Sequence, residues 1–169
     1  SSPDGQQCNN QFLFNIYMVI EALVLSYAGV RYFIPRSKKK YFLIGFLFFI
    51  TVFIYQLVSP QMGTFANFAQ SIASLLIVTL YITTIYQFAL NARLKKSPPE
   101  FWAIIGILIY FGCNAPYWGL FHEINEYSIE LSSKLFFVLT EVLSNLRYLF
   151  LTLSFILISK YFQKRRSIQ

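Results

Sequence analysis

The chain has 169 residues, of which 56% are hydrophobic, 20% are aromatic and only 12% are charged. Soluble domains usually contain about 25% charged residues, and they do not coat their surface with so many apolar groups. The net charge of +7 would suit a nucleic-acid-binding protein, but the basic residues form short clusters between apolar runs and no nucleic-acid motif accompanies them. We therefore expect a membrane protein whose partners include lipids and not nucleic acids.

Five apolar runs follow one another along the chain, each near the roughly 20 residues that a helix needs to cross about 30 Å of hydrocarbon. They span residues 11–33, 41–58, 65–90, 101–121 and 135–161. The segments between them hold proline, glycine and charged residues, which are typical of turns. The acidic segment between the fourth and fifth runs is expected to form either a short surface helix or a plain loop. The predicted fold is all-α: one polytopic bundle of about five transmembrane helices over residues 1–169.

Basic residues predict the orientation of this bundle. Twelve of the 14 Lys and Arg residues form three clusters, which follow the first, third and fifth runs. The clusters are Arg31, Arg36, Lys38, Lys39 and Lys40; Arg93, Lys95 and Lys96; and Lys160, Lys164, Arg165 and Arg166. Five crossings place all three clusters on one side of the membrane, which the positive-inside rule makes the cytoplasm. We expect a multi-pass protein of a bacterial cytoplasmic (inner) membrane, with its N-terminus outside and its C-terminus inside.

Two charged side chains are expected near the middle of the membrane. Glu21 lies about ten residues into the first run, and Arg147 lies about thirteen residues into the fifth. Both helices run in the same direction, so the two charges lie within about 5 Å of the same depth at 1.5 Å per residue. Because a charge in hydrocarbon is costly without a partner, we predict a Glu21–Arg147 pair. The pair would be a packing staple or a coupled proton or ligand site; a partner subunit or an upstream helix is the alternative source of either counter-charge.

Polar residues recur at helical spacing along one face of the fifth run: Glu141, Ser144, Asn145, Tyr148 and Thr152. Such a face should meet protein or water and not lipid. We predict an intramembrane polar network of Glu21, Arg147, Glu141 and Asn145, in which hydrogen-bonded packing is favoured over a solute pathway.

A proline interrupts the fourth run. Pro116 has no N–H group, and its ring clashes with the carbonyl of Gly112, four residues earlier, which predicts a kink. The freed carbonyl and the Asn114 side chain are either satisfied by neighbouring groups or available to coordinate a ligand in the outer half of the membrane.

Residues suited to catalysis or metal binding are scarce. His122 is the only histidine, and the two cysteines, Cys8 and Cys113, match no metal or redox spacing. The chain contains no Walker sequence, no HExxH motif and no Ser-His-Asp order. We therefore predict no catalytic residue, no metal and no cofactor, and we favour a protein that is not an enzyme.

Three short stretches carry a resemblance. They are Asn-Asn-Gln-Phe-Leu-Phe-Asn-Ile-Tyr-Met-Val-Ile-Glu over residues 9–21, Pro-Glu-Phe-Trp over residues 99–102 and Ile-Leu-Ile-Tyr-Phe over residues 107–111. In these stretches the chain resembles a group of uncharacterised small multi-helix membrane proteins of Bacteroidota. In that group the first stretch follows two earlier helices, so the resemblance implies a seven-helix protein when complete, with helices upstream of this chain. It implies a bacterial cytoplasmic membrane and no particular activity.

Three functions remain open. The favoured one is a non-enzymatic membrane domain: a sensor-type module or an accessory subunit of a larger membrane complex, with protein partners. Short loops and polar helix faces favour it. The second is a small transporter or channel subunit that uses Glu21, Arg147 and Glu141, although no inverted repeat is evident. The third is a lipid-modifying enzyme with Glu141 or His122 as base.

Overall fold

The computed structural model describes residues 4–32, 34, 39–58, 67–90 and 99–166. Across these residues the chain is helical and contains no strand. In chain order the elements are α1 (Asp4–Tyr32), α2 (Lys39–Val58), α3 (Asn67–Leu90), α4 (Pro99–Gly119), α5 (Phe121–Tyr127), α6 (Ile129–Phe137), the π-helical η3 (Val138–Leu143) and α7 (Ser144–Arg166). Five of the described segments are long and apolar enough to cross a membrane. The protein is therefore a multi-pass membrane protein with an all-helical fold.

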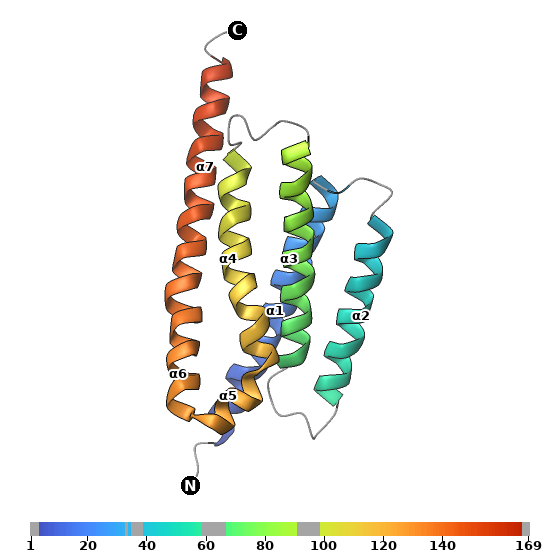
Figure 1. Ribbon diagram of the computed structural model, residues 1–169, viewed down its shortest axis with the longest axis vertical. Coiled ribbons are helices and arrows are strands. Elements are labelled where there is room, and N and C mark those ends of the chain that lie inside the picture. The colour runs from blue at the N-terminus through green and yellow to red at the C-terminus, as the bar shows by residue number, and fades with distance from the viewer. Residues whose placement is uncertain (1–3, 33, 35–38, 59–66, 91–98, 167–169) are drawn as a thin grey trace.

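Helices α3 and α4 form the centre of the bundle, and the other helices pack around them (Figure 1). Helix α7 packs along α4, whereas α1 and α2 both pack on α3. Glycines allow these close approaches, because a Cβ atom at Gly29 would overlap the side chain of Leu80 on α3. A Cβ atom at Gly45 of α2 would lie 2.7 Å from a methyl of Leu76, which is also on α3. The two outer helices thus lie directly against α3, as small residues permit in membrane proteins.

Hydrogen bonds join the central helix α3 to each of its neighbours α1, α2 and α4. The hydroxyl of Ser71 on α3 donates a hydrogen bond to the Ala115 carbonyl of α4 at 2.7 Å. The hydroxyl of Tyr81 donates to the Leu25 carbonyl of α1 at 3.2 Å. At the start of α3, the Ala69 N–H donates to the side-chain carbonyl of Gln56 on α2 at 2.6 Å. These three hydrogen bonds join α3 to α4, α1 and α2 and so serve helix packing.

The helix boundaries differ from the predicted ones chiefly at two places. Helix α1 begins at Asp4 and not near residue 11, although its membrane-compatible part is confined to Leu13–Arg31. The fifth span begins at Ile129, six residues before the predicted start at residue 135. Its beginning is capped by Ser128, whose hydroxyl accepts a hydrogen bond from the Leu131 N–H at 3.2 Å. This serine N-cap was the sequence signal for the earlier start.

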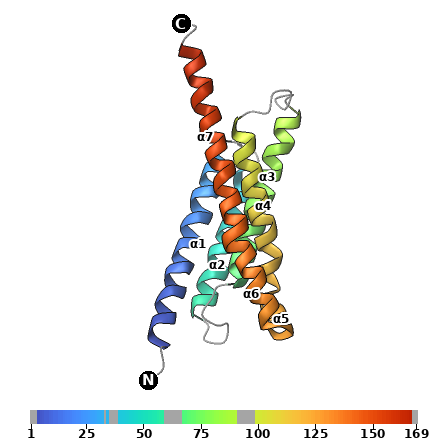
Figure 2. The same cartoon turned by 90° about the vertical axis from the view of Figure 1, so that its left-hand side faces the viewer.

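The segment between the fourth and fifth spans is helical, so the helix alternative is confirmed over α5, Phe121–Tyr127. Next, α6, η3 and α7 run on as one long helix that extends beyond the rest of the bundle at its C-terminal end (Figures 1 and 2). The π-helical turns of η3 contain Glu141. Such turns are rare and often lie at functional sites.

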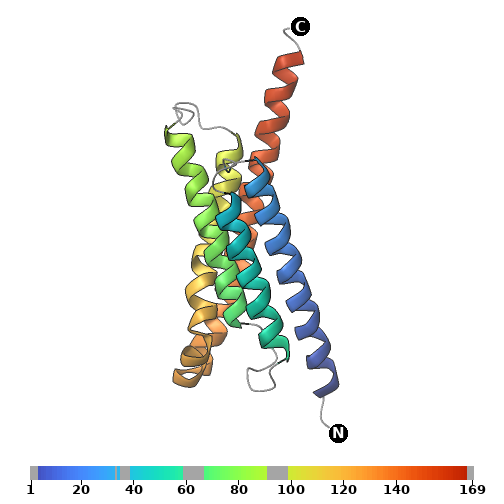
Figure 3. The ribbon, with the colours of Figure 1, turned by 90° about the vertical axis from the view of Figure 1, so that its right-hand side faces the viewer.

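The two ends of the bundle carry opposite charge. Arg31, Lys39 and Lys40 lie at the end where α1 stops and α2 begins, and Lys160 lies near the C-terminal end of α7 on the same side of the molecule (Figures 1 and 3). At the opposite end, the short helix α5 and the start of α6 carry Glu123, Glu126 and Glu130. The charge pattern that predicted the orientation is thus present as two distinct ends.

Candidate functional site: a buried ion pair between α1 and α7

Helix α7 is held against α4 by a glycine contact that faces its inner side. A Cβ atom at Gly106 would lie 2.7 Å from the Phe150 Cβ and 3.3 Å from the Arg147 carbonyl oxygen. The Phe150 ring stacks on Trp102, with ring centroids 6.1 Å apart and planes inclined by 10°. Arg147 lies one helical turn before Phe150 and therefore on the same face of α7. The contact of Phe150 with α4 thus directs the Arg147 side chain into the bundle.

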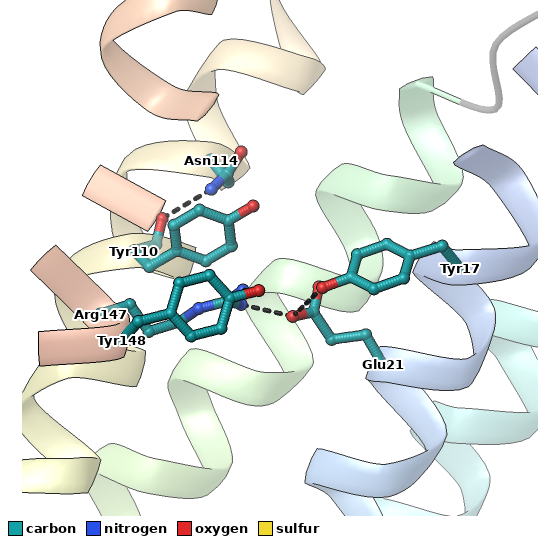
Figure 4. A network of polar contacts seen from close by, with 6 residues as sticks. All are labelled: Tyr17, Glu21, Tyr110, Asn114, Arg147 and Tyr148. Atoms are coloured by element: carbon teal, nitrogen blue, oxygen red, sulfur yellow. Dashed lines mark hydrogen bonds and ion pairs between the residues drawn. The ribbon is translucent and has the colours of Figure 1, made fainter. Parts of the chain in front are cut away.

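Arg147 and Glu21 form an ion pair that joins α7 to α1 (Figure 4). Their side chains are 4% and 16% exposed, respectively. The same Glu21 oxygen also accepts a hydrogen bond from the Tyr17 hydroxyl at 3.2 Å, one helical turn away. The contact predicted from equal depth is therefore present. It is a main link between α1 and α7, which otherwise pack on α3 and α4.

Aromatic rings surround the guanidinium group of Arg147. It lies 4.0 Å from the ring centroid of Tyr110 on α4 and 4.9 Å from that of Tyr148. One of its terminal nitrogens donates a hydrogen bond to the Tyr148 hydroxyl at 3.2 Å. Desolvated cation–π contacts of this kind contribute about 2 kcal/mol, which offsets part of the cost of burying the charge. Arg147 is thus stabilised by a carboxylate, a hydroxyl and two ring faces.

The Arg147–Glu21 pair is electrically neutral, because each side chain supplies the counter-charge of the other. Among the described residues the Nε atom of Arg147 is buried without an acceptor, so the network keeps one open donor. Two of its three tyrosines, Tyr17 and Tyr148, are about half exposed. The centre of the network is therefore closed, while its edge lies on the outside of the bundle between α1 and α7.

Glu141 and Asn145 do not join this network. Both side chains are exposed, and neither forms a hydrogen bond or ion pair with Glu21 or Arg147 in the described part of the chain. The reason is geometric: Asn145 precedes Arg147 by two positions, about 200° around a helix. When Arg147 points into the bundle, Asn145 must point out of it.

Asn114 is satisfied within its own helix. Its amide nitrogen donates to the Tyr110 carbonyl at 2.9 Å (Figure 4). Its amide oxygen accepts a hydrogen bond from the Trp118 indole N–H at 3.0 Å. Helix α4 continues through Pro116 to Gly119. Both ends of the Asn114 amide are therefore occupied, which favours the packing interpretation over ligand coordination.

The residues of the Arg147 network that sequence reasoning missed are Tyr17 and Tyr110. Tyr17 lies four positions before Glu21, a spacing at which side chains meet on a helix, and this signal was available in the sequence. Tyr110 carries no comparable signal, because its position over Arg147 depends on how α4 and α7 pack. The described residues contain no group of three or more His, Cys, Asp and Glu side chains that would hold a metal. His122 is exposed and pairs with Glu126 at 3.1 Å.

Comparisons with known proteins add no identity to this geometry: no family model, no curated protein and no solved structure matches the chain.

Proposed function

We propose that this chain is a non-enzymatic membrane module: an accessory subunit of a larger membrane complex, or a sensor-type membrane domain that acts through a protein partner. The observation that supports the proposal is the outer face of the fifth span. Its polar stripe lies outside the bundle: Glu141, Asn145, Tyr148 and Thr152 are all exposed. A partner helix would give this stripe a protein environment.

The depth of the stripe makes lipid an unsuitable neighbour. Glu141 precedes Arg147 by six positions, or about 9 Å along a helix. Since Arg147 pairs with Glu21 in the middle of the first span, Glu141 falls within the roughly 15 Å of hydrocarbon on the outer side of that level. A charged side chain at the centre of a membrane helix costs about 3 kcal/mol on insertion scales, and at the level of Glu141 part of that cost remains. A partner that donates hydrogen bonds to Glu141 and Asn145 would remove most of this cost.

Photo-crosslinking in native membranes tests the proposal. A photoreactive amino acid is placed at Asn145 on the stripe and, as the matched control, at Leu47, an exposed apolar residue of α2 that is 57% exposed. We expect the Asn145 probe to join one defined protein in good yield and the Leu47 probe to join lipid. Native mass spectrometry of the gently extracted complex then gives the partner's stoichiometry.

Two outcomes count against a partner at this face. One is crosslinking of both probes to lipid alone; the other is a chain that is extracted alone and monodisperse. A partner that stays bound in every condition supports an accessory subunit, whereas one whose binding changes with a stimulus supports a sensor-type domain.

A second candidate function is a small transporter or channel subunit. The observation that favours it is the Glu21–Arg147 pair in the middle of the membrane, with the hydroxyls of Tyr17 and Tyr148 at its edge. Ion or solute flux in proteoliposomes that is lost in Glu21→Gln would support this candidate. Flux equal to that of empty liposomes for the wild-type chain would remove it.

The membrane and the orientation belong to the same proposal. The basic end of the bundle, with Arg31, Lys39 and Lys40, supports a cytoplasmic location for that end in a bacterial inner membrane. Alkaline phosphatase fused after residue 166 should be inactive, and green fluorescent protein fused there should fluoresce. The opposite pair of results would invert the topology.

A further inference from the structure

A hollow of about 230 Å³ lies between α1 and α2 at the basic end of the bundle. Its floor is Leu80 of α3, which is 1% exposed, and its rim includes Leu23 and Tyr27 of α1 and Leu43 of α2, which are exposed. The hollow therefore opens sideways to the membrane, and its walls are apolar.

The hollow exists because α1 and α2 each lie against α3 and not against one another. Gly29 seats α1 on Leu80, and Gly45 seats α2 on Leu76. Both leucines form part of the hollow's lining. The glycine contacts thus hold the two outer helices on α3, and the space between them is left for another molecule.

The dimensions of the hollow suit part of a hydrocarbon chain. It extends from Lys39 to Phe46 along α2, seven positions or about 10 Å. One leaflet offers about 15 Å of hydrocarbon, so the hollow spans most of the depth of that leaflet. Its volume is below the roughly 300–1,000 Å³ of pockets that enclose whole ligands. A narrow acyl chain fits these limits better than a compact solute does.

Positive charge at the mouth of the hollow favours a lipid with an anionic head group. Lys39 lines the hollow where α2 begins, and the polar Ser26 and Tyr27 lie on the facing side of α1. Arg31 follows one turn after Tyr27, and no acidic residue lies among the described lining residues. A lysine at the membrane surface attracts anionic lipid. Lys39 is therefore placed to pair with a phosphate while the chain below it occupies the hollow.

We propose that the hollow between α1 and α2 binds one anionic phospholipid, with an acyl chain against Leu76 and Leu80 and the head-group phosphate at Lys39. The site is separate from the Glu21–Arg147 pair and from the polar stripe of α7, so it does not depend on the proposed partner. Occupancy of the hollow would then depend on the anionic lipid content of the membrane.

Native mass spectrometry of the full chain, titrated in detergent micelles with phosphatidylglycerol or phosphatidylcholine, tests the proposal. We expect one phosphatidylglycerol to bind more tightly than phosphatidylcholine. Lys39→Gln should weaken that binding about fivefold, the equivalent of one lost charge contact. Lys40→Gln is the matched control: Lys40 is its sequence neighbour and is exposed, its ammonium lies 5.2 Å from the Tyr41 ring centroid, and it does not line the hollow.

A second variant tests whether an acyl chain occupies the hollow. Ser26→Leu places a larger apolar side chain in the hollow and should lower phosphatidylglycerol binding without removing a charge. Equal losses in Lys39→Gln and Lys40→Gln would overturn the site in favour of general surface charge. Unchanged binding in Ser26→Leu, or equal competition by glycerophosphoglycerol, which has no acyl chain, would show that no chain occupies the hollow.

Discussion

The inner and outer faces of the continuous helix formed by η3 and α7 differ in whether their polar side chains have partners. On the inner face, Arg147 is 4% exposed and has a carboxylate, a hydroxyl and aromatic rings as partners. On the outer face, Glu141 and Asn145 are exposed and have no such partners among the described residues. On the inner face only the Nε atom of Arg147 lacks a partner among the described residues, whereas on the outer face Glu141 and Asn145 have no partner there.

This difference indicates where to look for function. A charge whose counter-charge comes from its own chain mainly fixes packing, because its strongest interaction is already made. A charge left outside the bundle at membrane depth needs a partner that the chain does not supply. The inner pair therefore determines how α1 and α7 are joined, and the outer stripe is the better guide to the protein's role.

The largest effect is expected when the inner pair is broken. Arg147→Met leaves Glu21 without its counter-charge in a mostly buried position, and removal of one partner of a buried pair costs about 3–5 kcal/mol. We expect the free energy of unfolding, measured by titration with sodium dodecyl sulfate in mixed micelles, to fall by about 3 kcal/mol.

A double-mutant cycle sharpens this prediction. Glu21→Leu alone should also destabilise, because it leaves Arg147 buried and unpaired. The combination of both substitutions should cost less than the sum of the two, since neither charge then remains alone. Strictly additive losses would mean that the pair contributes nothing as a pair, and the inner face would then resemble the outer one.

A smaller loss of unfolding free energy is expected when a larger residue is placed at the contact between Gly106 of α4 and Phe150 of α7. Gly106→Ala would place a Cβ atom 2.7 Å from the Phe150 Cβ and 3.3 Å from a backbone oxygen, so α7 must move away from α4. Overpacking of this kind costs about 1–3 kcal/mol.

The matched control for Gly106→Ala is Gly112→Ala on the same helix, where an added Cβ meets nothing within 4 Å. It should leave the unfolding free energy unchanged or raise it by up to about 1 kcal/mol, because alanine is a better helix former than glycine. Similar losses in both variants would mean that loss of glycine, and not contact with α7, is responsible.

Asn114→Leu should have an effect of comparable or smaller size. It leaves the buried Trp118 indole N–H without the acceptor that it now has at 3.0 Å, and an unsatisfied buried donor costs about 1–3 kcal/mol. The same micelle titration measures the loss. Asn125→Leu, an exposed asparagine on α5, should be close to neutral. A neutral Asn114→Leu would show that the indole finds another acceptor.

Much of the fold follows from the sequence because hydrocarbon thickness fixes helix length and leaves few alternatives. The second span was predicted as residues 41–58 and is Lys39–Val58. Boundaries failed where short-range hydrogen bonds decide them, as at Ser128. The π-helical turns of η3 were also missed, since no periodicity in the sequence distinguishes them from an α-helix.

The site divides in the same way. Equal depth was sufficient to bring Glu21 and Arg147 together, because depth depends only on residue number. The side of the helix on which each residue lies depends on rotation, and rotation is set by contacts such as that of Gly106 with Phe150. Grouping Asn145 with Arg147 ignored this rotation. Residues at one level of a membrane helix share a network only when they also share a face.

The smallest effect on the isolated chain, and the most informative one, is expected on the outer face. Glu141→Leu and Asn145→Leu remove exposed polar groups that have no partner within the described chain, so the unfolding free energy in micelles should change by less than about 0.5 kcal/mol. In native membranes the same substitutions should reduce the amount of copurifying partner, measured by quantitative mass spectrometry. Val142→Leu, an apolar change at an exposed neighbour of Glu141, should leave that amount unchanged. A clear loss of stability in the isolated chain would mean that α7 satisfies its outer stripe from within, and the contrast between its two faces would disappear.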